Sequence, residues 1–109
     1  MPSTYKVLGQ SNPAATTATA LYSVPANRSA VASTLSVCNQ GASSATFRVA
    51  VRPAGATLAA THYLVFDSTL TANDSAFLTL GMTLATTDVV TVYASSASLS
   101  FSLFGSEIS

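Results

Sequence analysis

Residues 33–52 read STLSVCNQGASSATFRVAVR, and this stretch decides the fold. Leu35 and Val37 alternate with hydroxyl residues before a turn around Gly41, and Phe47 begins a second alternation that runs to the end of the stretch. A period of two gives each segment one apolar face and one polar face. The stretch therefore predicts two half-buried antiparallel strands on either side of a turn, and we expect the other strands to pack on this pair.

Short apolar segments bounded by Pro, Gly, Asn and Ser occur along the whole chain. We predict strands over residues 4–8, 16–24, 29–38, 46–52, 61–67, 75–80, 88–94 and 99–104, the last two forming a hairpin. Residues 58–61 stay open between a helical turn and a loop, and residues 81–87 are expected to form a loop from which Met82 and Leu84 plug the core. Seven or eight strands at spacings of about 8–12 residues predict an all-β antiparallel β-sandwich, immunoglobulin-like or jelly-roll.

The predicted strand over residues 61–67 differs from the others. Leu64 and Phe66 share one face with His62, whereas Tyr63 and Val65 occupy the other. Apolar residues on both faces predict burial on both sides, inside the sandwich or against a neighbouring molecule.

The composition predicts one domain, residues 1–109, in which residues 1–14 provide an edge strand or an N-terminal arm. Charged residues make up 7% of the 109 residues, and the formal net charge is zero. Hydroxyls and small side chains must therefore cover the surface, and little electrostatic repulsion keeps copies apart. These properties favour a subunit packed against other molecules, and we expect a homo-oligomer rather than a free enzyme.

Several partners are excluded by the same composition. One lysine and three arginines form no basic stripe for nucleic acid. No apolar run approaches the ~20 residues of a membrane helix, and the N-terminal MPSTYKVLGQ lacks the pattern of a signal peptide. We expect synthesis in a cytoplasm. Cys38 is the only cysteine, so we expect no internal disulfide or cysteine metal cluster, and a small buried hydrophobe at this position.

Catalytic chemistry would depend on His62, the only histidine. A nucleophilic triad would need His62 beside Asp67, Asp74 or Asp88 and a suitably placed serine, and no G-x-S-x-G motif is present. We interpret His62 as a packed or interface residue, and the aspartates, with Asn73, as turn residues rather than calcium ligands. The sequence predicts no catalytic residue, no metal and no cofactor.

Four motifs carry a family resemblance: Val37-Cys38-Asn39, Arg48–Val51, Asp88–Tyr93 and Phe104–Glu107. In their context, YKVLGQSNPAATTATALYSVPANRSAVASTLSVCNQGASSATFRVAVRP and TANDSAFLTLGMTLATTDVVTVYASSASLSFSLFGSEIS, the chain resembles small virion structural proteins of tailed bacteriophages, especially those of cyanobacterial and other aquatic phages. The resemblance spans nearly the whole chain, and its motifs are structural.

The resemblance implies a β-sandwich subunit located in the virion and made in the host cytoplasm. A single small domain without heptads or repeats favours a capsid cement or decoration protein that bridges and stabilises major capsid subunits. Its expected partners are the major capsid protein or other virion proteins. A tail, baseplate or fibre module is the first alternative. A small hydrolytic module using His62, or a carbohydrate-binding module, is the second, and four tyrosines could serve the latter: Tyr5, Tyr22, Tyr63 and Tyr93.

Charged and aromatic residues on the arm, the turns, one strand face and the tail are the candidate subunit contacts. Arg48 and Arg52 lie two pleats apart and should project the same way, toward a neighbouring subunit or toward solvent. The predicted contacts are Tyr5, Lys6, Arg28, Arg48, Arg52 and Glu107.

Overall fold

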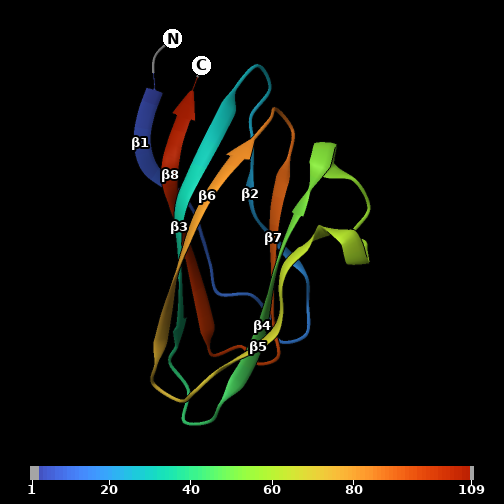
Figure 1. Ribbon diagram of the computed structural model, residues 1–109. Coiled ribbons are helices and arrows are strands. Elements are labelled where there is room, and N and C mark those ends of the chain that lie inside the picture. The colour runs from blue at the N-terminus through green and yellow to red at the C-terminus, as the bar shows by residue number, and fades with distance from the viewer. Residues whose placement is uncertain (1–2, 109) are drawn as a thin grey trace.

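Eight strands form two four-stranded antiparallel sheets in the computed structural model, which describes residues 3–108 (Figure 1). Sheet A has the order β1 (Ser3–Ser11), β8 (Leu99–Ile108), β3 (Ser29–Asn39), β6 (Ser75–Leu84). Sheet B has the order β2 (Thr19–Ser23), β7 (Val89–Ala94), β4 (Ala45–Arg52), β5 (Tyr63–Leu70). The predicted all-β sandwich is confirmed. The first two residues of the predicted arm lie outside the described residues, and residues 3–11 form an edge strand.

The strand order is that of a jelly roll. β4 pairs with β5, β3 with β6, β2 with β7 and β1 with β8, all antiparallel. The chain is thus one long hairpin, β1–β4 against β5–β8, wrapped so that its strands divide between two sheets. An immunoglobulin domain divides its strands differently, with A, B, E and D in one sheet and C, F and G in the other. Of the two architectures that the sequence left open, the order selects the jelly roll.

The two strands of the opening stretch do not form a hairpin. β3 belongs to sheet A and β4 to sheet B, so the connection between them crosses from one sheet to the other. The predicted hairpin of residues 88–104 is wrong for the same reason, because β7 lies in sheet B and β8 in sheet A. Alternation of apolar and polar residues shows which face of a strand is buried, but it does not show which other strand pairs with it. A hairpin and a crossing connection therefore leave the same pattern.

Asn39 organises the connection between β3 and β4. Its side chain is 1% exposed, and its Nδ2 donates hydrogen bonds to the carbonyl oxygens of Ser43, Leu70 and Thr71. Its Oδ1 accepts from the amide of Gly41 at 2.9 Å. A buried amide with its hydrogen bonds satisfied joins this connection to the end of β5 at low cost.

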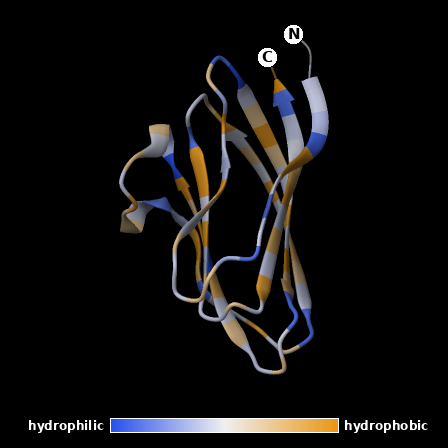
Figure 2. Ribbon diagram, turned by 180° about the vertical axis from the view of Figure 1, so that it is seen from behind, coloured by the Kyte–Doolittle hydropathy of each residue, from blue (hydrophilic) through white to orange (hydrophobic). Residues whose placement is uncertain are grey.

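The core lies between the inward faces of the two sheets. Figure 2 shows hydrophobic segments along the strands of both sheets. Phe47 of sheet B and Phe101 of sheet A meet edge to face, with ring centroids 6.2 Å apart. Apolar side chains from both sheets are almost completely buried around this pair: Leu35, Val37, Val49, Val90, Val92, Leu99 and Leu103.

β5 and β6 differ from their predicted form. β5 is an edge strand with Leu64 52% and Phe66 59% exposed, so the expected burial on both faces does not occur within this chain. β6 continues beyond residue 80, where a loop was expected, because Gly81 adopts a φ of 60° and lets the strand pass a register shift. Leu84 belongs to the buried core and Met82 packs against that core, as predicted.

Two short 3₁₀ turns, η1 (Pro53–Gly55) and η2 (Ala60–His62), connect β4 to β5. They account for the region around residues 58–61 that was left open between turn and loop. Within residues 3–108, no helix has the length and apolar character needed to cross a membrane.

Cys38 is not the buried hydrophobe that was expected. It is half-buried, and it is paired in register with Ser75 of β6 and Ser100 of β8. The residues before and after it, Val37 and Asn39, are the buried ones, because the outward position in β3 falls on Cys38.

Candidate interaction surface

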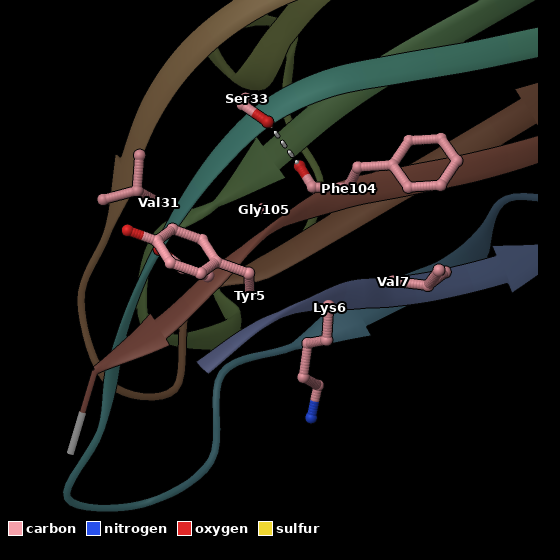
Figure 3. A pocket seen from close by; sticks show the side chains of 8 residues that line it. Tyr5, Lys6, Val7, Val31, Ser33, Phe104 and Gly105 are labelled. Carbon is pink, nitrogen blue, oxygen red and sulfur yellow. Dashed lines mark hydrogen bonds between the residues drawn. The ribbon is translucent and has the colours of Figure 1, made fainter. Parts of the chain in front are cut away.

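A shallow groove crosses the outer face of sheet A where β1, β8 and β3 run side by side (Figure 3). Its volume is about 590 Å³, and its apolar lining comes from Tyr5, Val7, Val31 and Phe104. Val7 is paired in register with Phe104 and is 45% exposed, whereas Tyr5 is 86% exposed. Exposed apolar side chains gathered in one place are typical of a surface that contacts another molecule.

The backbone of Gly105 forms part of the groove. A side chain at this position would collide with the carbonyl oxygen of Val31, so β3 and β8 can approach each other only because residue 105 is glycine. The Ser33 hydroxyl donates a hydrogen bond to the carbonyl oxygen of Phe104 at 3.2 Å (Figure 3). The close approach of β3 and β8 therefore fixes the backbone beneath the groove.

A buried carboxylate lies behind the groove, between the two sheets. Glu107 of β8 is 7% exposed, and its Oε2 accepts a hydrogen bond of 2.6 Å from the Tyr22 hydroxyl of sheet B. Its Oε1 lies 3.1 Å from Lys6 Nζ and 3.8 Å from Arg28 Nη1. In Figure 3 Lys6 points away from Tyr5, as neighbours along a strand should. One carboxylate thus ties β1, β2, β8 and the turn before β3 together.

The surroundings of Glu107 shift two pKa values in opposite directions. The hydrogen bond from Tyr22 lowers the pKa of Glu107, with help from Lys6 and the charge of Arg28 and against the effect of burial. Burial, followed by the hydrogen bond to the Glu107 carboxylate, raises the pKa of Tyr22 far above its ordinary value of 10.0. The cluster favours an ionised carboxylate facing a neutral phenol.

A second cluster lies on the outer face of sheet B. The Arg48 guanidinium donates two hydrogen bonds to the Asp67 carboxylate, at 2.6 Å and 3.2 Å, which lowers the pKa of Asp67. The central carbon of the Arg48 guanidinium, Cζ, lies 4.1 Å from the ring centroid of Phe66 and 4.3 Å from that of Tyr93. A flat cation held between two rings and a carboxylate fastens the edge strand β5 to its sheet.

The structure brings three of the six predicted contact residues together, since Lys6 and Arg28 both contact Glu107. Arg48 and Arg52 share the outer face of sheet B, as predicted, and Arg52 donates to Thr91 Oγ1 at 3.1 Å. Tyr5 stands apart in the groove. That these six residues reach another subunit stays a prediction.

All eight charged side chains of the chain have a partner within it. The two clusters above account for five of them, Lys6, Arg28, Glu107, Arg48 and Asp67, and Arg52 donates to Thr91 Oγ1. Asp74 accepts from the amide of Ser75, and Asp88 accepts from the amides of Ala54 and Ala85. Several of these charges remain exposed, as in Lys6 and Arg28 at 43% and 46%, but the rest of the surface consists largely of hydroxyls and exposed apolar side chains.

Three of the residues considered for chemistry, His62, Asp74 and Asp88, serve the loops. Asp67 does not, because it lies within β5 and binds Arg48, so its predicted role as a turn residue is wrong. His62 Nδ1 accepts a hydrogen bond from the amide of Ala59 at 3.0 Å, and Asp74 and Asp88 accept from turn amides, as expected of turn residues. Among residues 3–108, no three His, Cys, Asp or Glu side chains gather in a way that could hold a metal ion.

Sequence reasoning missed Val7 and Phe104 of the groove and Tyr22 of the carboxylate cluster. Val7 and Phe104 belong to predicted strands, but the side of the strand on which each would be exposed depends on sheet order. Tyr22 could have been paired with Glu107 only by knowing that the ends of β2 and β8 meet between the sheets. No known protein family, curated protein or solved structure matches this chain.

Proposed function

We propose that this chain is a structural protein of a tailed-bacteriophage particle, a capsid cement or decoration protein that bridges and stabilises neighbouring major capsid subunits. The resemblance of its strand motifs to small phage virion proteins supports the class of particle. The jelly roll is compatible with it, since this architecture is frequent in viral capsid proteins, although it also occurs in lectins and does not define a function.

The observation that carries the proposal is the chemistry of the surface. Every charged side chain is engaged within the chain, while Tyr5, Val7 and Phe104 expose an apolar groove on sheet A. A contact made through shape and apolar burial suits a subunit that remains bound in many copies.

The groove can be tested with particles that lack the protein. Adding the purified chain back should raise the temperature at which the shells release their contents. Tyr5→Ser should restore less of this stability, because it removes the most exposed ring of the groove. Tyr5→Phe keeps the ring and should restore stability fully.

Leu64→Ser is the matched control, since Leu64 is also exposed but lies on β5 of sheet B. It should act like the unaltered chain. If adding the protein leaves shell stability unchanged, the cementing role is wrong. If Tyr5→Ser and Leu64→Ser behave alike, the groove is not the contact surface.

A further inference from the structure

The edge of sheet A formed by β6 differs from the other three sheet edges. β6 pairs with β3 on one side and is the last strand of its sheet, so backbone amides and carbonyls along its other side lack a strand partner. Its ten residues, SAFLTLGMTL, include no charge and no proline. Phe77 is 70% exposed on its outer side, and the inward-facing Leu78, Leu80 and Met82 are only half-buried.

The other edges carry features that discourage pairing with another chain. β1 has the charged Lys6 and a register shift between Val7 and Gly9. β2 is five residues long and is followed closely by Pro25. β5 contains Asp67, a charged residue at a φ of 54°. Only β6 combines length, neutrality and exposed apolar side chains.

We propose that β6 is a self-association edge, on which the β6 strand of a second copy of this chain pairs antiparallel about a two-fold axis. The absence of charge favours self-pairing, because β6 places no charged side chain at the seam, the line along which the two β6 strands would pair. The nearest charged residue, Asp74, precedes the strand, and antiparallel pairing places the two Asp74 carboxylates at opposite ends of the seam.

The side-chain pattern is also compatible with itself. A two-fold register centred on Leu78 sets inward residues of one copy beside inward residues of the other, since directly opposite residues of an antiparallel pair share a face of the sheet. Phe77 of each copy then flanks the seam on the outer face, and the half-buried Leu78 and Leu80 gain apolar neighbours. This register pairs only the regular part of β6, Ser75–Leu80, which precedes the irregularity at Gly81.

The short connection from β5 to β6 is also compatible with a second copy of the chain at this edge. β5 ends at Leu70 and β6 begins at Ser75, so the free edges of the two sheets lie on the same side of the sandwich. A two-fold axis perpendicular to sheet A also keeps both copies of sheet B on the same side of the extended sheet.

The test is sedimentation equilibrium of the full chain over a wide range of concentrations. We expect a monomer–dimer equilibrium, with amide-exchange protection in β6 that increases with concentration. Phe77→Lys should raise the dimer dissociation constant at least about tenfold, because each dimer carries the substitution twice and the two ammonium groups lie diagonally across the interface between the two β6 strands. Thr79→Lys, at an exposed position of the same strand, should act similarly and serves if Phe77→Lys does not fold.

Thr4→Lys is the matched control for Thr79→Lys, because Thr4 is exposed on β1 at the opposite edge of sheet A and does not line the groove. It should leave the dissociation constant unchanged. A chain that stays monomeric at all concentrations overturns the proposal, and so does a dimer that Thr4→Lys weakens more than Phe77→Lys or Thr79→Lys. The purified chain is used alone, so the result does not depend on the proposed place in a virion.

Discussion

Replacing Glu107 by Gln tests whether the buried carboxylate fastens the two sheets and the N-terminal strand together. The substitution keeps the shape of the side chain, and its amide oxygen can still accept the hydrogen bond from Tyr22. It removes the negative charge that faces Lys6 at 3.1 Å and Arg28 at 3.8 Å. The change in stability therefore reports the charge rather than the packing.

The magnitude follows from the exposure of the partners. The Lys6 and Arg28 side chains are 43% and 46% exposed, so each ion pair contributes less than about 1 kcal/mol. The hydrogen bond from Tyr22 is buried and loses its charge-assisted character, at a cost of about 1 kcal/mol. Near neutral pH we expect Glu107→Gln to lower the free energy of unfolding by about 1–2 kcal/mol.

The loss should depend on pH in a defined direction. Because the pKa of Glu107 is lowered in the folded chain, its stabilisation is complete above the ordinary value of 4.5 and is lost as the pH falls through the folded-state value. Urea denaturation of both proteins should therefore show a gap near neutral pH that narrows on acidification. At low pH Glu107 is protonated and resembles glutamine.

Two further variants complete this experiment. Tyr22→Phe should destabilise the chain by about 1–2 kcal/mol, because it removes the donor to a buried carboxylate. Tyr5→Phe, which alters an exposed phenol, should change stability by less than about 0.5 kcal/mol. A gap between the unaltered chain and Glu107→Gln that stays constant from neutral to acidic pH would refute the reasoning.

Other substitutions probe the remaining structural features, each by urea denaturation unless stated. Asn39→Ala should cost about 3–5 kcal/mol, because it leaves buried carbonyl oxygens without donors, and a loss below about 1 kcal/mol would contradict this role. Gly105→Ala should lower the free energy of unfolding by more than about 2 kcal/mol, because the new side chain forces β3 away from β8. Gly81→Ala, in open space at a φ of 60°, should lower it by about 1 kcal/mol. A larger loss for Gly81→Ala than for Gly105→Ala would be inconsistent with the geometry. Arg48→Lys should reduce amide-exchange protection in β5 through the loss of the two-pronged pair with Asp67, and unchanged protection would argue against that fastening.

The buried faces of the strands could be predicted from the sequence, and their partners could not. Alternation around Leu35, Val37 and Phe47 reflects burial, which is a local property of each strand. The placement of β3 and β4 in different sheets depends on how the whole chain wraps, and a hairpin would show the same alternation. The expected hairpin of β7 and β8 failed on this point.

The charge clusters illustrate the same limit at longer range. Lys6 and Glu107 stand 101 residues apart in the chain and meet because β1 pairs with β8 along the edge of sheet A. Their residue types suggested a role in contacts, and only the sheet order shows that they contact each other. The exposure of Cys38 likewise followed from the face of β3 on which it falls, not from its preference for burial.

The measurement that tests the proposed function most directly is the copy number of this chain relative to the major capsid protein in purified virions, by quantitative mass spectrometry. A capsid cement protein predicts a ratio near one or a simple fraction of it, because each copy occupies a repeated site on the shell. A few to a few tens of copies in a particle would contradict it and favour a place in the tail or baseplate. Absence from purified virions would contradict a structural role in the particle altogether.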